Sequence, residues 1–218
     1  MAPGGCTGLI DFVYVIDVSG SVRNDIGKMR AFASLVMRQF TLGEAAARFG
    51  LVKFSTSGSL VVPLTADEQE LQSGIDSLRA GGWTCLQCGF EQAAVAFNRA
   101  TPRAESSQVV LLLTDGNPNK PAPASAAEQS AITEADSLKA SGVTIFAWGF
   151  GGVDYEVLTK VATQPAAVHA YKITDFTAIT ALVEKARAPS SAARAHSTVR
   201  AHRDERLVAP MITRDAHM

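Results

Sequence analysis

The stretch LIDFVYVIDVSGSV, residues 9–22, decides how the chain can fold. Its first part, residues 9–17, is an almost unbroken apolar run, which is typical of a strand buried on both faces of a sheet. Three oxygen-bearing side chains, Asp17, Ser19 and Ser21, then follow at alternate positions where the strand ends. A carboxylate and two hydroxyls at the carboxyl end of a buried strand indicate a polar site there.

The rest of the chain alternates between predicted helices and strands. We expect a helix over 22–40, strands at 48–56 and 59–64, helices at 67–79 and 85–99, a strand at 107–116, a helix over 124–141, a strand at 143–150, a short helix near 154–163, a strand near 168–173 and a helix at 175–187. This order predicts an α/β fold, with a doubly wound, mostly parallel central sheet flanked by helices. Because proline suits an edge strand, Pro63 makes 59–64 the expected short antiparallel edge strand.

Composition narrows the class of protein. The 218 residues are 47% hydrophobic and 19% charged with a net charge of -1, so nothing predicts a nucleic-acid partner. No apolar run reaches the roughly 18–20 residues of a membrane span. The first residues lack signal-peptide features, which leaves a cytosolic protein or a segment of a secreted one open. We expect an N-terminal extension at 1–7, one folded domain at 8–187 and a flexible tail at 188–218, where periodicity is lost.

Oxygen donors recur on three segments of the predicted sheet edge. DVSGS supplies Asp17, Ser19 and Ser21, GGWT supplies Thr84 just before a helix, and TDG supplies Asp115 after the second buried strand. Hard oxygen donors without histidine or cysteine favour Mg²⁺, Mn²⁺ or Ca²⁺ over zinc or copper. Each segment alone also has a plainer interpretation, because Asp and Ser after a strand often cap a helix and Asp-Gly often forms a turn.

These residues resemble the von Willebrand factor type A domain, also called the integrin I domain. The metal-ion-dependent adhesion site of that family has Asp-x-Ser-x-Ser, a Thr on a second loop and an Asp on a third, matched here by Asp17, Ser19, Ser21, Thr84 and Asp115. The resemblance covers residues 8–187, element order included. It implies a divalent cation bound by these five residues, Mg²⁺ before Mn²⁺ or Ca²⁺, with an Asp or Glu of a partner protein completing its shell. It also implies that the last helix, 175–187, acts as a lever between low- and high-affinity states.

The loops that carry these donors supply further candidates. We expect Trp83, Asn117 and Asn119 to contact the ligand, although Trp83 could equally pack down on its loop. The odd number of cysteines, Cys6, Cys85 and Cys88, excludes a disulfide-rich scaffold. Residues three apart on a helical first turn can form a local disulfide, so Cys85–Cys88 is one pairing. Reduced thiols and a bridge from Cys6 to one of the two are the alternatives.

Function follows from the resemblance together with what the chain lacks. The resemblance implies an adhesion or protein-binding module, extracellular or at the cell surface, whose partner is a matrix or cell-surface protein. An intracellular scaffold subunit of a multiprotein assembly is the alternative. A metal-dependent phosphoryl-transfer enzyme is disfavoured, because Ser19 stands where a second acid would be needed and no P-loop motif occurs. His169 lacks neighbours that indicate a catalytic triad, so we expect no enzyme.

Overall fold

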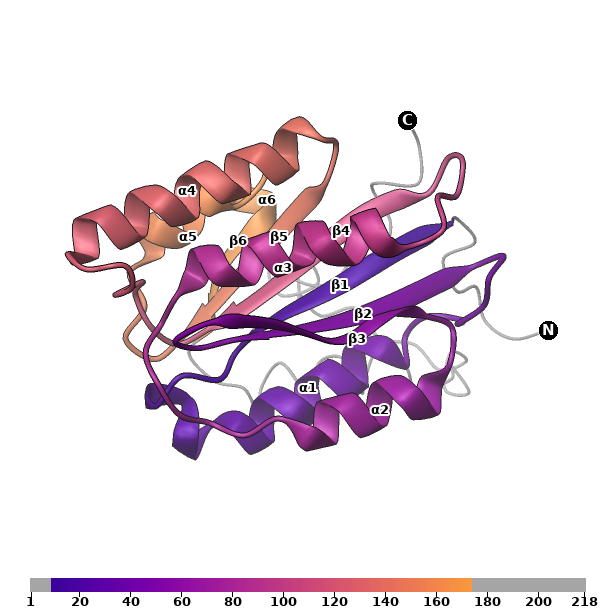
Figure 1. Cartoon of the computed structure of the whole chain (residues 1–218), viewed down its shortest axis with the longest axis horizontal. Helices are drawn as coiled ribbons and strands as arrows, with labels where there is room; N and C mark the ends of the chain where they lie inside the picture. The colour runs from indigo at the N-terminus through magenta and orange to yellow at the C-terminus, as the bar shows by residue number, and fades with distance from the viewer. Residues whose placement is uncertain (1–8, 174–218) are drawn as a thin grey trace, which may run out of the picture.

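The computed structural model describes residues 9–173 of the chain. Cys6, the predicted helix 175–187 and the predicted tail 188–218 therefore lie outside the described residues. The elements run β1 (Ile10–Asp17), η1 (Ser21–Asn24), α1 (Ile26–Met37), β2 (Ala47–Phe54), β3 (Gly58–Thr65), α2 (Glu68–Ser77), α3 (Leu86–Arg99), β4 (Ser107–Thr114), α4 (Ala124–Ala140), β5 (Thr144–Phe150), α5 (Tyr155–Val161), α6 (Ala166–His169) and β6 (Ala170–Ile173) (Figure 1).

The strands form one sheet in the order β3-β2-β1-β4-β5-β6. Every neighbouring pair is parallel except β2 and β3, which confirms the mostly parallel sheet with an antiparallel edge. The edge strand is not short, because β3 spans eight residues and pairs with β2 from Phe54 back to Phe49 through two register shifts. Pro63 is exposed on this edge strand, as its missing N–H group requires.

Side-chain alternation along β1 builds two hydrophobic layers. Phe12, Tyr14 and Ile16 join one cluster with residues of α1 and α2, whereas Val13 and Val15 join a second cluster with residues of α3, α4 and α5. Figure 1 shows these two groups of helices on opposite sides of the sheet. Burying each large apolar side chain contributes about 1.5–3 kcal/mol, so a strand covered on both faces is firmly held. Its carboxyl end, where Asp17 lies, is therefore a rigid support for a site.

Two predicted elements are divided differently in the structure. The helix expected over 22–40 is a 3₁₀ turn, η1, followed by α1, and the Asp25 N–H closes the turn by donating to Val22 O at 2.8 Å. The strand expected near 168–173 begins only at Ala170, because a helical turn ends at His169, whose Nδ1 lies 3.1 Å from Pro165 O. No helix among residues 9–173 is long and apolar enough to cross a membrane.

Candidate metal-binding site

Adjacent strands bring the first and third donor segments together. β1 and β4 pair in parallel from Ile10–Ser107 to Ile16–Leu113, so both chains leave the sheet at the same edge. There the Ser19 and Ser21 Oγ atoms lie 3.0 Å apart, and Ser21 Oγ donates to Asp115 Oδ1 at 2.7 Å. Since the single hydroxyl proton of Ser21 goes to Asp115, Ser19 is the donor to Ser21. A continuous row of oxygens thus runs from the β1 loop to the β4 loop.

Thr84 reaches the same place from the loop before α3. Gly81 N donates to Val18 O at 2.7 Å and Gly20 N donates to Gly82 O at 3.0 Å, which fastens this loop to the DVSGS segment. A Cβ atom built on Gly116 would lie 3.7 Å from Ser21 Oγ and 3.8 Å from Thr84 Oγ1. The hydroxyls of two separate loops therefore converge beside the third loop, as the sequence predicted.

Gly82 is required by the backbone of that loop. Its φ of 90° is in the left-handed region, and a Cβ would lie 2.6 Å from Thr56 Oγ1 in the β2–β3 turn. Only glycine adopts this conformation at little cost. The glycine-rich GGWT segment is thus explained by the turn that presents Thr84.

Asp17 is fully buried and already holds two hydrogen bonds. Its Oδ1 accepts from Ser19 N at 2.8 Å, and its Oδ2 accepts from Thr114 Oγ1 at 2.6 Å. Burial raises the pKa of Asp17 to about 6, the bonds from Thr114 and Ser19 oppose this rise, and the charge of Asp115 adds to it. Thr114 was missed by the sequence analysis, although its hydroxyl precedes Asp115 in the TDG motif.

Asp115 makes the site more negative. Burial raises its pKa from the ordinary value, the hydrogen bond from Ser21 opposes the rise, and the charge of Asp25 adds to it. Within residues 9–173, neither Asp17 nor Asp115 forms an ion pair with a lysine, arginine or histidine. Two partly desolvated carboxylates without a counter-charge favour a bound cation.

The donor set fits a hard divalent ion. Two carboxylates and three hydroxyls supply oxygen alone, which suits Mg²⁺, Mn²⁺ or Ca²⁺. In the part of the chain that the structure describes, no group of three or more histidine, cysteine, aspartate or glutamate side chains is placed to hold a metal ion. A site at Asp17, Ser19, Ser21, Thr84 and Asp115 therefore depends on its hydroxyls as well as its two carboxylates.

The three residues expected to contact the ligand have different roles in the structure. Trp83 is 58% exposed, so it does not pack down on its loop, and Lys120 Nζ lies 5.1 Å from the centroid of its ring. Asn119 Oδ1 accepts from Thr84 N at 2.8 Å, and Asn117 Oδ1 accepts from Asp154 N at 2.7 Å. Both asparagines thus tie neighbouring loops together through their amide oxygens, and ligand contact by Trp83, Asn117 and Asn119 stays a prediction.

A disulfide joins Cys85 and Cys88 in the first turn of α3, with their Cα atoms 5.3 Å apart. It follows Thr84 directly, and Cys85 N donates to Ser55 O at 2.7 Å. The chain segment after Thr84 is therefore held both to its own helix and to the β2–β3 turn.

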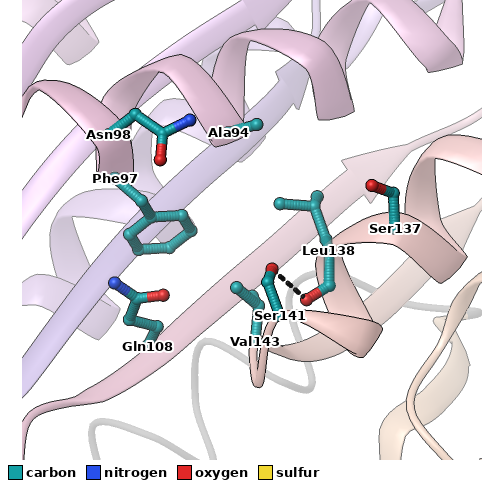
Figure 2. Close-up of a pocket in the computed structure, with 8 residues that line it drawn as sticks. All are labelled: Ala94, Phe97, Asn98, Gln108, Ser137, Leu138, Ser141 and Val143. Atoms are coloured by element: carbon teal, nitrogen blue, oxygen red, sulfur yellow. Dashed lines mark hydrogen bonds between the residues drawn. The ribbon is translucent and has the colours of Figure 1, made fainter.

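A separate cavity of about 410 Å³ lies near the amino ends of β4 and β5, at the end of the sheet opposite Asp17 and Asp115. Figure 2 shows Phe97 extending from α3 toward Gln108, with Ser137 and Leu138 of α4 across the hollow. The lining has no titratable side chain; it consists of Ala94, Phe97, Asn98, Gln108, Ser137, Leu138, Ser141 and Val143. This hollow therefore offers no acidic or basic side chain.

Comparisons with known proteins agree with this fold. The model of the von Willebrand factor type A domain family matches residues 11–185. Matrilin-1 of Mus musculus is 30% identical over 184 residues, which cover 80% of this chain and 35% of the matrilin, and Matrilin-1 of Homo sapiens is 29% identical with the same coverage. Proximal thread matrix protein 1 from the mussel byssus has a TM-score of 0.71 at 26% identity, over 83% of this chain and 47% of that one. The chain spans about a third of the length of the matrilins it matches.

Proposed function

The chain belongs to the von Willebrand factor type A domain family, and on that premise we propose that it is a metal-dependent protein-binding module. Asp17, Ser19, Ser21, Thr84 and Asp115 would hold one divalent cation, and an Asp or Glu side chain of a partner protein would complete its shell. The observation that carries the proposal is the row of oxygens from Ser19 through Ser21 to Asp115, with the Thr84 hydroxyl beside it.

Neighbouring residues of this chain orient the proposed ligands of the ion. Thr114 and the Ser19 backbone fix the orientation of the Asp17 carboxylate, and Ser21 fixes that of Asp115. Asn119 fixes the backbone of Thr84. A bound cation would supply a Lewis-acidic centre that attracts an anionic oxygen of the partner. With so few carboxylates in the site, the cation would keep a net attraction for one more.

The identity of the ion follows from the donors. Proximal thread matrix protein 1 has been described with zinc in its metal-ion-dependent adhesion site (MIDAS) motif. In this chain the donors are oxygens only, which favours Mg²⁺, with Mn²⁺ and Ca²⁺ as alternatives.

We place the protein outside the cell or at the cell surface, with a matrix or cell-surface protein as its partner. The similarity to matrilins and to a thread matrix protein supports this placement, and so does the Cys85–Cys88 disulfide, since disulfides persist in oxidising compartments. We expect no catalytic turnover, because the family and the matrilin relatives support a binding module and the hydroxyls and carboxylates of the site are assigned here to holding an ion.

Calorimetric titration of metal-free protein with Mg²⁺ and with Mn²⁺ tests the proposal. Wild type should bind about one ion per chain, and Thr84→Ala and Asp115→Ala should each weaken binding by about tenfold or more, because each removes an inward oxygen donor. Thr133→Ala is the matched control, because Thr133 is exposed on α4 and bonds only its own helix at Gln129 O.

Circular dichroism on the same samples separates loss of the site from loss of the fold. Normal ion binding by folded Asp115→Ala, or no ion binding by wild type, would show that the proposed site is wrong.

A further inference from the structure

Lys120 is held directly against the candidate metal site. Its backbone N–H donates to Thr84 O at 3.3 Å, and the adjacent Asn119 N–H donates to the same carbonyl at 3.0 Å. Together with the bond from Thr84 N to Asn119 Oδ1, three hydrogen bonds join these two loops at Thr84. The backbone of Lys120 therefore has a fixed place next to a proposed metal ligand.

The Lys120 side chain packs over an aromatic ring and forms no ion pair within the described residues. Its ammonium lies over the Trp83 ring, a cation–π contact that orients the group without neutralising it. Lys120 forms no ion pair with an acidic side chain among residues 9–173. Trp83 is also one of two large apolar side chains that the described residues expose, the other being Tyr155.

We infer that Lys120 and Trp83 form a second anion-binding subsite, so that the partner is an acidic segment carrying two carboxylates within a few residues. This inference rests on the proposed metal-dependent function. One carboxylate would complete the shell of the ion, and the second would pair with the Lys120 ammonium. Charge complementarity selects this partner, because an unpaired cation beside a carboxylate-binding ion rewards a second negative group and disfavours a basic one.

The reach of a peptide makes the arrangement testable. An extended chain advances about 3.3 Å per residue, so two acids separated by two residues can address neighbouring points on one surface. The probes are three acetylated and amidated peptides, Ala-Asp-Ala-Ala-Asp-Ala, Ala-Asp-Ala-Ala-Asn-Ala and Ala-Asp-Ala-Ala-Lys-Ala. Their affinities for Mg²⁺-loaded protein are measured at low ionic strength, where a surface ion pair is least screened.

The decisive quantity is the ratio of the affinities of the two-acid and one-acid peptides. We expect this ratio to be about threefold larger in wild type than in Lys120→Gln, as for a partly exposed ion pair. Taking the ratio between variants cancels the statistical advantage of a peptide with two acids. Arg23→Gln is the matched control, because Arg23 is an exposed cation two residues after Ser21 and should leave the ratio unchanged.

Charge reversal gives a second, independent readout. Lys120→Glu should prefer the lysine-containing peptide over the two-acid peptide, an outcome that mere loss of loop structure would not produce. In protein with ¹³C-methylated lysines, the Lys120 signal should shift with the two-acid peptide and stay in place with the one-acid peptide.

The outcomes separate the two proposals. Metal-dependent binding of the one-acid peptide with equal ratios in wild type and Lys120→Gln would overturn the second subsite alone. A ratio lost in Arg23→Gln and kept in Lys120→Gln would also overturn it. If wild type binds Mg²⁺ but no acidic peptide, or binds no Mg²⁺, the proposed function fails and the subsite falls with it.

Discussion

Asp17 carries a buried carboxylate whose two oxygens already accept bonds from Ser19 and Thr114, and burial raises its pKa to about 6. A cation and a proton compete for this group, so we predict that Mg²⁺ affinity falls by up to about tenfold per pH unit as the pH drops below about 6. Calorimetry between about pH 5 and 7.5 measures this dependence. A flat profile across that range would contradict the role given to Asp17.

The same group affects the stability of metal-free protein. Because its pKa is raised above the ordinary value of 3.8, the folded state binds the proton more tightly than the unfolded state. Its contribution to stability is therefore present at low pH and is lost as the pH rises from about 4 to about 6. Saturating Mg²⁺ should restore stability above that range, and in Asp17→Asn this part of the pH dependence should disappear.

The sequence was sufficient to predict which five oxygen-bearing side chains meet at the carboxyl edge of the sheet, but not the residues that support them; their role as metal ligands stays a prediction. Asp17, Ser19 and Ser21 stand out because polar side chains follow at alternate positions where an apolar strand ends. Thr114 has no such signal, because a threonine at the end of a strand is common and does not by itself indicate a functional role. Its hydrogen bond to Asp17 depends on the pairing of β1 with β4. Lys120 lies over Trp83 only because two loops meet at Thr84.

At the scale of elements, Gly58 controls how closely the β2–β3 hairpin approaches α3. A Cβ on Gly58 would clash with the Cys88 carbonyl group and lie 2.8 Å from Gln92 Cγ. We predict that Gly58→Ala lowers the free energy of unfolding by about 1–3 kcal/mol, the usual cost of overpacking. Because α3 follows Thr84, its displacement should also weaken Mg²⁺ binding.

Gly27→Ala is the control for this change. Gly27 lies in α1, where an added Cβ would meet nothing within 4 Å, so alanine should stabilise by about 0.5 kcal/mol through its higher helix propensity. Urea unfolding and Mg²⁺ titration of both variants compare a helix effect with a packing effect. Equal behaviour of the two variants would show that the close contact at Gly58 does not matter.

Helices and strands were predictable wherever the pattern of apolar residues is clear. The strands at β1, β4 and β5 were found within one or two residues because their apolar runs are continuous. The division of 22–40 into η1 and α1 was not, because the apolar spacing continues through the break at Asp25. Likewise β3 was expected to be shorter than it is, since pairing with β2 extends a strand beyond its apolar residues.

Over the whole of the described fold, a buried charge cluster lies at the end of the sheet opposite the proposed metal site. Asp11 lies six positions before Asp17 on β1, which places it roughly 20 Å away. It is buried and accepts from Arg48 Nε at 2.8 Å and from Arg103 Nη2 at 2.6 Å. Arg103 also donates to the carbonyls of Ile10, Glu44 and Ala46, so this cluster joins the start of β1 to the loops around it.

We predict that Asp11→Asn lowers the free energy of unfolding by about 3–5 kcal/mol, because it removes the carboxylate that Arg48 and Arg103 share and leaves Arg48 with only the exposed Glu44 at 3.6 Å. Burial alone would raise the pKa of Asp11, but the bonds and charges of Arg48 and Arg103 outweigh it and lower the pKa below 3.8. The unfolded state thus binds more protons in acid, so this stabilisation is present above about pH 4 and is lost as the pH falls through the lowered pKa. Wild type should approach Asp11→Asn in stability as the solution is acidified.

Mg²⁺ affinity in Asp11→Asn should remain that of wild type while the protein stays folded, because no residue of the Asp11 cluster belongs to the proposed metal site. Urea unfolding at neutral pH and calorimetry at low temperature measure the two properties on one sample. Lys160→Gln, which breaks exposed ion pairs with Glu128 and Glu156, should leave both unchanged. If Asp11→Asn instead weakened ion binding in proportion to its loss of stability, the rigid β1 strand would be coupling the two ends, and the independence of site and scaffold would be wrong.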